Sequence, residues 1–310
     1  MLRTRAGVLA DCRRFFAERE VLEVQTPALS FAATTEPNIA SLVVHSGLWP
    51  ERTAYLHTSP ELPMKRLLAA GSGAIYQICT VFRDSDRGRR HRPEFTMLEW
   101  YRPGWIARQL MDEVESLLRY LGRARPPGGT REFSYRALFQ HYLQLDPFTA
   151  DVAECRACCR EHQLDPPSSM SDHLDEWLDF LLSMLIMPRF EPSSLTFVYD
   201  YPASQAALAQ VVEKEGVPVA ERFELYWGSL ELANGFQELA DAEEQARRFK
   251  DENRRRRERN LPEMPVDKLF LSALAAGMPA SAGVAVGLDR VLMALTGAET
   301  IGEVLSFDDF

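Results

Sequence analysis

The densest group of residues able to do chemistry lies between positions 84 and 101. The segment from Asp84 to Arg92 carries four arginines and a histidine, a composition suited to a polyanion such as a triphosphate. The run that follows alternates with a period of two, which places four side chains on one face of a strand: Phe95, Met97, Glu99 and Tyr101. These groups offer stacking and hydrogen bonds to an organic ligand, whereas an exposed charged hairpin would account for the same pattern equally well.

A second strand-like run, Glu231-Leu-Ala-Asn-Gly-Phe-Gln-Glu238, carries two carboxylates and an amide. Such groups hold Mg²⁺ against phosphates or bind the ammonium group of an amine. Glu231 and Glu238 have opposite parity, so a regular strand would point them to opposite faces, and a bulge near Gly235 would bring them to one face. A solvated edge strand is the alternative.

A third segment, Gly283-Val-Ala-Val-Gly-Leu-Asp-Arg290, predicts a strand that runs into a helix. Glycines allow a backbone to approach a nucleotide closely, and a helix N-terminus favours phosphate. The spacing matches neither a Walker loop nor a dinucleotide fingerprint, and plain packing of a helix on a sheet explains it about as well.

Two other clusters have simpler interpretations. The three cysteines near position 158 lie with His162 in a helical stretch without paired CxxC units, so no zinc site is expected. The arginine run 254–257 belongs to a helix with expected ion pairs four residues apart: Glu243/Arg247 and Glu244/Arg248. A solvated helix face is therefore favoured over a nucleic-acid patch, as the net charge of −10 also indicates.

The order of expected helices and strands around these segments predicts an α+β fold with a mostly antiparallel sheet flanked by helices. Helices are expected over 5–20, 61–70, 108–125 and from Asp241 onward, and 134–190 is largely helical. Strands are expected over 54–57, 74–83, 94–101 and 195–199, with a hairpin over 222–239 that turns near Gly228. Thr58-Ser59-Pro60-Glu61 predicts a helix start with a hydroxyl cap, and Asp241 with Glu244 predicts a capping box.

The 310 residues suggest about two domains at roughly 150 residues each, or one large unit. Hydrophobic residues make up 46% and charged residues 26%, which is typical of globular proteins and argues against a disordered chain. No apolar run is long enough to span a bilayer, and the N-terminus lacks a signal-peptide core. A cytoplasmic protein is expected.

In this order, the segments resemble the catalytic core of class II aminoacyl-tRNA synthetases. The first helix with Pro27 looks like the dimer-forming motif 1, the segment 81–101 like motif 2, and 283–290 like motif 3. The strings PEFTMLEWY and ELANGFQEL narrow the resemblance to the lysyl branch. Within that branch, HTSPE at 57–61, YDYPASQAAL at 199–208 and Ala285 are typical of the stand-alone paralogues that modify elongation factor P.

This resemblance covers nearly the whole chain and implies one catalytic domain over 1–310, with a helical insertion near 130–190. Motif 1 begins almost at Met1, so no anticodon-binding domain is expected. The implied activity is an ATP-dependent, AMP-forming ligase that adenylates (R)-β-lysine and passes it to a lysine ε-amino group of elongation factor P. The implied cofactors and partners are ATP, Mg²⁺ and a second copy in a homodimer, without tRNA or membrane. A truncated synthetase activating α-lysine and a non-catalytic amino-acid-binding regulator are the alternatives.

The resemblance also assigns roles at the nucleotide. Arg83 would hold the α-phosphate and Arg290 the γ-phosphate, and these are the predicted catalytic residues. Phe95 would stack on adenine, and Gly287 would let ATP approach the backbone. The remaining predicted ATP contacts are Asp84, Ser85, His91, Arg92, Glu231 and Leu232, and the predicted Mg²⁺ ligands are Glu99 and Glu231.

The implied amino-acid pocket is lined by seven residues: Ser59, Pro60, Glu61, Tyr101, Asn234, Glu238 and Ala285. Its carboxylates would pair with the ammonium groups of the substrate. Lysyl-tRNA synthetases have glycine where Ala285 stands, so the added methyl would reshape the pocket and favour a β-amino acid. One methyl is worth about 1–3 kcal/mol of discrimination.

Two positions depart from the family pattern. After Arg83 the family usually has a small polar residue and then a glutamate that orients ATP, whereas this chain has Asp84 and Ser85, with Asp86 one place on. Either Asp86 substitutes through a shifted loop, or the contact with ATP is weaker. Arg92 stands where asparagine is common.

Overall fold

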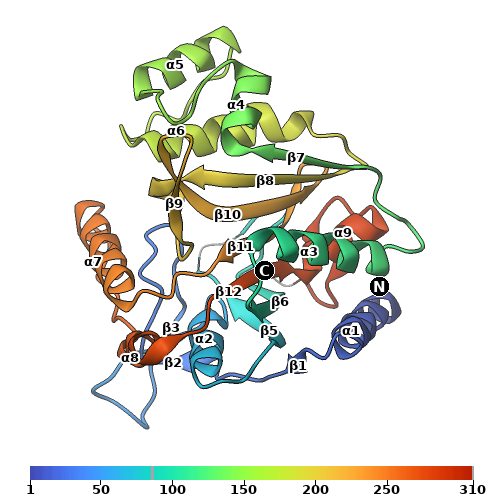
Figure 1. Ribbon diagram of the computed structural model, residues 1–310, viewed down its shortest axis with the longest axis vertical. Helices are drawn as coiled ribbons and strands as arrows, with labels where there is room; N and C mark the ends of the chain where they lie inside the picture. The colour runs from blue at the N-terminus through green and yellow to red at the C-terminus, as the bar shows by residue number, and fades with distance from the viewer. Residues whose placement is uncertain (85–86, 309–310) are drawn as a thin grey trace. The chain divides into compact units, whose positions relative to one another are not determined.

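The computed structural model describes residues 1–84 and 87–308 (Figure 1). The backbone divides into two compact units. The first unit comprises Met1–Arg125 and Glu238–Phe310, and the second comprises Pro126–Gln237. The predicted α+β class with a mostly antiparallel sheet is confirmed, because most strand pairs in both units are antiparallel.

The strands of the first unit form two groups. Its main strands are β1 (Leu22–Glu23), β5 (Ile75–Phe82), β6 (Glu94–Pro103) and β12 (Ser281–Gly287). They lie in the order β1-β5-β6-β12, with β1 parallel to β5 and the other pairs antiparallel. The small strands β2 (Leu29–Ser30), β4 (Ala54–Leu56) and β3 (Val43–Val44) form a separate antiparallel sheet.

Among the described residues of this unit, six helices and one short turn accompany the strands: α1 (Leu2–Ala17), α2 (Glu61–Ala69), α3 (Ala107–Leu121), α7 (Ala242–Glu258), α8 (Lys268–Gly277), α9 (Leu288–Thr296) and the 3-10 turn Ile301–Val304. Helix α1 covers one face of the main sheet, where the Phe16 ring stacks on Tyr76 with centroids 4.5 Å apart and meets Trp100 edge-on at 5.2 Å. This face is therefore closed by apolar packing, and the opposite face is left for polar side chains.

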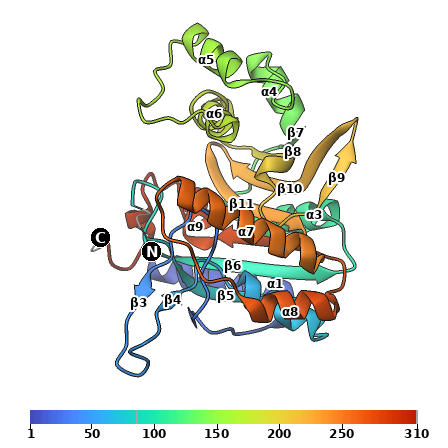
Figure 2. The same cartoon turned by 90° about the vertical axis from the view of Figure 1, so that its left-hand side faces the viewer.

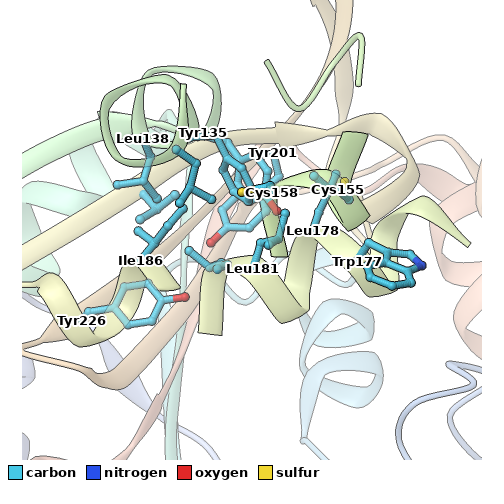
Figure 3. Packing of buried hydrophobic residues seen from close by; sticks show 14 of the residues in the cluster. Tyr135, Leu138, Cys155, Cys158, Trp177, Leu178, Leu181, Ile186, Tyr201 and Tyr226 are labelled. Atoms are coloured by element: carbon cyan, nitrogen blue, oxygen red, sulfur yellow. The ribbon is translucent and has the colours of Figure 1, made fainter. Parts of the chain in front are cut away.

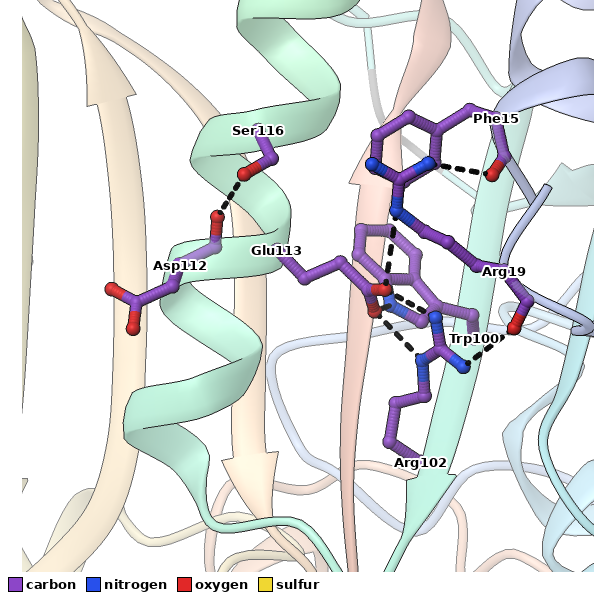
Figure 4. A network of polar contacts seen from close by, with 7 residues as sticks. All are labelled: Phe15, Arg19, Trp100, Arg102, Asp112, Glu113 and Ser116. Carbon is purple, nitrogen blue, oxygen red and sulfur yellow. Dashed lines mark hydrogen bonds and ion pairs between the residues drawn. The ribbon is translucent and has the colours of Figure 1, made fainter.

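A buried ionic network fixes α3 to the same closed face (Figure 4). Glu113 on α3 accepts hydrogen bonds from Trp100 Nε1 at 3.0 Å and Arg102 Nε at 2.9 Å. Arg102 also donates to the Arg19 carbonyl at 3.4 Å, just beyond the end of α1. Removing one partner of such a buried pair typically costs about 3–5 kcal/mol, so this network holds two helices and a strand in one arrangement.

The second unit is built around the long strand β10 (Val217–Trp227). It pairs antiparallel with β11 (Leu230–Gln237), β8 (Leu195–Pro202) and β9 (Val211–Lys214), and β7 (Thr130–Ser134) lies parallel to β8. The helical elements are α4 (Tyr135–Leu143), α5 (Val152–Glu161), α6 (Leu174–Leu181), a π-helical turn (Leu182–Ile186) and the 3-10 turns Met187–Arg189 and Ala203–Gln205. The three α-helices fall within the stretch predicted to be helical (Figure 2).

The core of the second unit packs these helices on β8 and β10 (Figure 3). Tyr135 on α4 and Tyr201 on β8 meet with ring centroids 4.7 Å apart. Cys155 and Cys158 on α5 pack into the same cluster, and burial raises the pKa of the Cys155 thiol to about 12. The cysteines thus serve as small apolar side chains of this core.

The predicted hairpin is confirmed, but its bulge lies elsewhere. Tyr226 pairs with Glu231 and Leu225 with Ala233, so Leu232 is the extra residue on β11. Gly235 sits instead in a regular part of the strand, directly opposite Phe223. A Cβ at Gly235 would collide with the Phe223 ring, so the glycine there serves packing, and the prediction of a bulge at Gly235 is wrong.

The helix caps also differ from the sequence prediction. Pro60 is the N-cap of α2. Ser59, one residue before the cap, accepts a hydrogen bond at its Oγ from the Glu61 amide at 2.9 Å. Asp241 caps α7 as predicted, but the carboxylate of Glu244 binds Arg248 and Arg247 and does not complete the capping box. Arg247 therefore pairs with Glu244, three residues before it, and not with Glu243 as the sequence predicts.

None of the helices among residues 1–84 and 87–308 is long and apolar enough to cross a membrane.

Candidate active site

The open face of the first unit's sheet carries the predicted alternation of side chains. Across β6 and β12, Tyr101 pairs with Gly283, Glu99 with Ala285, and Met97 with Gly287. Paired residues on antiparallel strands point to the same face, so large side chains on β6 stand beside small ones on β12. A Cβ at Gly283 would overlap the Glu238 carboxylate and the Tyr101 ring, which means that only glycine fits there.

A buried group of charged side chains occupies this face. We call it the carboxylate cluster, and its members are Glu61, Lys65, Glu99 and Glu238. Lys65 Nζ lies 2.6 Å from Glu61 Oε1 and 2.5 Å from Glu238 Oε2, and its side chain is 0% exposed. Two carboxylates therefore share a single ammonium group, and Glu99 adds a third carboxylate to the cluster, which leaves it with a net negative charge when its carboxylates are ionised.

Glu99 lies in the cluster with both carboxylate oxygens hydrogen-bonded. Tyr101 donates its hydroxyl to Oε1 at 2.5 Å, and Ser59 donates to Oε2 at 2.9 Å. Burial, with repulsion from Glu61, raises the pKa of Glu99 to about 8, although these hydrogen bonds oppose the shift. An additional cation next to Glu99 would favour its charged form and so would bind with a gain in electrostatic energy.

Glu238 responds to the same environment. Burial raises its pKa to about 7, with attraction to Lys65 opposing the shift and repulsion from Glu61 adding to it. Burial alone would lower the pKa of Lys65, but attraction to Glu238 and Glu61 raises it above its ordinary value. Lys65 is thus a permanent cation, and Glu99 and Glu238 are the groups whose protonation would change when a cationic ligand binds.

Cationic side chains gather elsewhere in the same unit, at the connection after β5 and the first turn of α9. We call Arg83, Arg90, His91 and Arg290 the arginine cluster. Arg290 Nη2 lies 2.7 Å from His91 Nε2, and its Nε donates to the Arg90 carbonyl at 3.3 Å. Burial, with repulsion from Arg290 and Arg89, lowers the pKa of Arg90. Crowded guanidinium groups of this kind suit a polyphosphate.

Arg83 and Phe95 lie together at the ends of β5 and β6. The Arg83 guanidinium is 5.1 Å from the centroid of the Phe95 ring, and both side chains are partly exposed. Phe95 belongs to the same face of β6 as Glu99. An aromatic face next to a guanidinium can hold a base and a phosphate of one nucleotide.

Arg92 is engaged by the C-terminal segment. Its Nε and Nη2 donate to the two carboxylate oxygens of Asp308 at 2.6 and 2.8 Å. Its Nη1 donates to the carbonyls of Gly88 and His91 at 2.7 and 2.9 Å. Arg92 therefore ties the backbone of the arginine-rich connection to the end of the chain, a contact that nothing in the sequence pattern indicated.

The other predicted ATP and substrate residues lie as follows. Asp84 is exposed, and its amide donates to the Ala40 carbonyl at 2.8 Å. Ser85 lies outside the described residues, as does Asp86. Glu231, Leu232 and Asn234 lie on β11 of the second unit, where Asn234 accepts a hydrogen bond from Arg222 at 3.2 Å. Their roles at a nucleotide or an amino acid stay predictions.

The sequence interpretation missed Lys65, the cation at the centre of the carboxylate cluster. Glu61 and Lys65 are four residues apart on α2, which is the spacing of a helical ion pair. That signal could have found the residue, but the same spacing usually marks a solvated surface pair. Only the fold shows that this pair is buried and that Glu238, far away in the sequence, completes it.

Residues 1–309 match the family model described as tRNA synthetases class II (D, K and N). The chain belongs to this class II tRNA synthetase family. It is 44% identical over 306 residues to the elongation factor P–(R)-β-lysine ligase of Salmonella paratyphi B, covering 98% of this chain and 93% of that protein. The identity to the protein of the same name in Klebsiella pneumoniae is 45% over 306 residues, with the same coverage.

As in other class II synthetases, ATP implies an accompanying Mg²⁺, so the predicted ligands need a test against the structure. Glu99 does not suit a Mg²⁺ ligand, because both of its oxygens already accept hydrogen bonds, from Tyr101 and Ser59. Among the residues that the structure describes, no group of three or more His, Cys, Asp or Glu side chains is placed to hold a metal ion. Glu99 fits the carboxylate cluster better.

Proposed function

We propose that this class II synthetase relative is an ATP-dependent, AMP-forming ligase that activates (R)-β-lysine and transfers it to a lysine side chain of elongation factor P. The observation that carries the proposal is the carboxylate cluster, in which two carboxylates bind one buried lysine and Glu99 supplies a third. Lysine isomers bring two ammonium groups, which such a cluster can neutralise. The names of the relatives supply the acceptor and the isomer.

In the first step, a carboxylate oxygen of the amino acid forms a bond to the α-phosphorus of ATP, and pyrophosphate leaves. Charge builds on the α-phosphate during this displacement, and we propose that Arg83 stabilises it. Arg290 would hold the far phosphates, and the Phe95 ring would stack on adenine. The protein supplies positioning and electrostatic stabilisation, and it needs no covalent intermediate of its own.

In the second step, the ε-amino nitrogen of the acceptor lysine attacks the carbonyl carbon of the adenylate. An amide bond forms, the bond to the phosphate oxygen breaks, and AMP leaves with loss of a proton from the nitrogen. The ammonium groups of the bound β-lysine would stay with Glu61, Glu99 and Glu238 throughout. The carbonyl carbon is thereby kept at one place for both steps.

Ala285 would set the isomer preference. It pairs with Glu99 across β6 and β12, so its methyl group stands on the same face as the carboxylate cluster. A methyl at this place would displace the amino group of an α-amino acid more than that of a β-amino acid. We further propose that the enzyme acts as a cytoplasmic homodimer on Mg²⁺-bound ATP, with a protein and not a tRNA as acceptor.

Amino-acid-dependent exchange of pyrophosphate into ATP tests the proposal. The substrates to compare are (R)-β-lysine, (S)-β-lysine, α-lysine and the other standard amino acids. Strongest exchange with (R)-β-lysine is the expected result. Preference for α-lysine would favour a truncated synthetase, and absence of exchange together with amino-acid binding would favour a regulator.

A further inference from the structure

We propose that Lys65 is a specificity-determining residue of the amino-acid pocket, because its ammonium group lies between carboxylate oxygens of Glu61 and Glu238 and leaves the cluster with the charge that a doubly cationic amino acid neutralises. The proposal rests on the proposed function only in that an amino acid occupies this cluster. It holds for either lysine isomer.

The position of Lys65 makes it unusual among charged residues. Its side chain is 0% exposed, and it joins Glu61 on its own helix to Glu238, which follows β11 in the sequence. Burying an ammonium group is costly unless it is paired. The two short contacts supply that pairing, so the lysine stays charged over the whole working pH range.

The contacts use one oxygen of each carboxylate. Lys65 lies against Oε1 of Glu61 and Oε2 of Glu238. The other oxygen of Glu238 is directed at β12, as the overlap with a Cβ at Gly283 shows. Lys65 thereby orients Glu238 so that its second oxygen faces the strand that also carries Ala285.

The charge count then decides which amino acids fit. Without Lys65, the three carboxylates would repel one another with no ammonium group between them, and ionising the cluster would be harder. With Lys65, the cluster is left with two uncompensated negative charges when fully ionised. An amino acid with two ammonium groups neutralises both, whereas one with a single ammonium group leaves a buried charge unpaired.

The test is the affinity for the amino acid as a function of pH, measured by calorimetry with whichever of (R)-β-lysine and α-lysine the wild-type enzyme activates. Cations bind the ionised carboxylates, so affinity rises with pH until the cluster is ionised. In Lys65→Met the pKa of Glu238 rises further because the attraction to Lys65 is lost, and we expect the midpoint to move upward by about 1–3 pH units. Affinity at pH 7 should fall at least about tenfold.

The matched control is Arg66→Met, which removes an exposed cation from the next position of the same helix. We expect its midpoint and affinity to equal those of the wild type. An unchanged midpoint in Lys65→Met would overturn the proposal, even if affinity or melting temperature fell, because a purely structural lysine would not set the ionisation of the cluster.

A second pair of variants serves as the test if Lys65→Met does not fold. Lys65→Met combined with Glu238→Gln removes both members of the buried pair, a change that proteins often tolerate. Compared with Glu238→Gln alone, the double variant should again show a higher midpoint, because the remaining carboxylates of the cluster then lack a buried ammonium group beside them. Equal midpoints in the two variants would refute the role of Lys65. Activation of some other amino acid by the wild type would instead refute the proposed function.

Discussion

The carboxylate cluster and the arginine cluster belong to the same unit, but they are built in opposite ways. The carboxylate cluster is buried: the exposed fractions of Glu99, Glu238 and Lys65 are 2%, 1% and 0%. In the arginine cluster, Arg90 and His91 lie on an exposed connection, and Arg83 and Arg290 are half-buried. Buried charges interact strongly and are weakly screened, whereas exposed charges are screened by salt. If the proposed function holds, the buried cluster would provide selectivity for the amino acid, and the arginine cluster would provide attraction for the phosphates.

The largest effect is expected at the buried end. Glu238→Gln should lower kcat/KM for (R)-β-lysine by about 10²–10³-fold, because truncating one partner of a buried charge pair costs about 2–5 kcal/mol. The KM for ATP should change little. Steady-state pyrophosphate exchange measures both values, and Glu243→Gln on the exposed face of α7 is the control. A change confined to the KM for ATP would contradict the division between the two clusters.

The glycines of β12 give a matched pair of variants. Gly283→Ala places a methyl group onto Glu238 and Tyr101, so we expect the KM for the amino acid to rise about tenfold or more and stability to fall by about 1–3 kcal/mol. At Gly287→Ala the nearest atom, Arg290 Cδ, is 3.9 Å away, so the protein itself accommodates the methyl. Denaturant unfolding and exchange kinetics should therefore separate the two variants, and equal loss of stability in both would contradict the packing described here.

The pH dependence of stability should reveal the buried carboxylates. The pKa values of Glu99 and Glu238 are raised to about 8 and about 7, so the folded protein binds protons more tightly than the unfolded chain above pH 4.5. The stability of the ligand-free protein should therefore decrease as pH rises from about 5 to 8 by this contribution. Added (R)-β-lysine should raise the melting temperature more at pH 8 than at pH 6. A larger rise at pH 6 would contradict the assignment.

Ala285→Gly should change the isomer preference of the proposed amino-acid pocket. Removing the methyl is expected to shift the ratio of kcat/KM for (R)-β-lysine and α-lysine toward α-lysine by about tenfold. Competition between the two isomers in the exchange assay measures this ratio directly. The KM for ATP serves as the internal control, and an unchanged ratio would remove Ala285 from the specificity of the pocket.

The smallest effect is expected at the exposed end. Asp308→Asn removes the bidentate contact with Arg92 and so loosens the connection that carries His91. Because this pair is exposed, the KM for ATP should rise only about two- to fivefold, with less effect at high salt. The KM for the amino acid should stay unchanged. A lower KM for ATP would mean that Asp308 competes with the nucleotide for Arg92.

The sequence predicted the strands and helices around the site because their patterns are local. The alternation from Phe95 to Tyr101 and the turn near Gly228 depend on neighbouring residues, and both are confirmed. The sequence did not show that Gly235 serves packing against Phe223 or that Arg248 competes for the Glu244 carboxylate, because both contacts depend on neighbours in the fold.

Contacts between segments far apart in the chain could not be predicted from the sequence either. The pairing of Lys65 with Glu238, and of Arg92 with Asp308, joins residues far apart in the chain. Neither pair has a spacing that a single sequence displays. The residues implied by the family resemblance were nevertheless brought together in part, because Ser59, Glu99 and Tyr101 share hydrogen bonds.

The most direct test of the proposed activity is the transfer step itself. The purified protein is incubated with ATP, (R)-β-lysine and elongation factor P, and the factor is then analysed by peptide mass spectrometry, with α-lysine and lysine tRNA in parallel reactions. We predict one lysine side chain of the factor to gain a single β-lysyl group, with AMP formed in equal amount and no aminoacylated tRNA. Charged tRNA together with an unmodified factor would contradict the account.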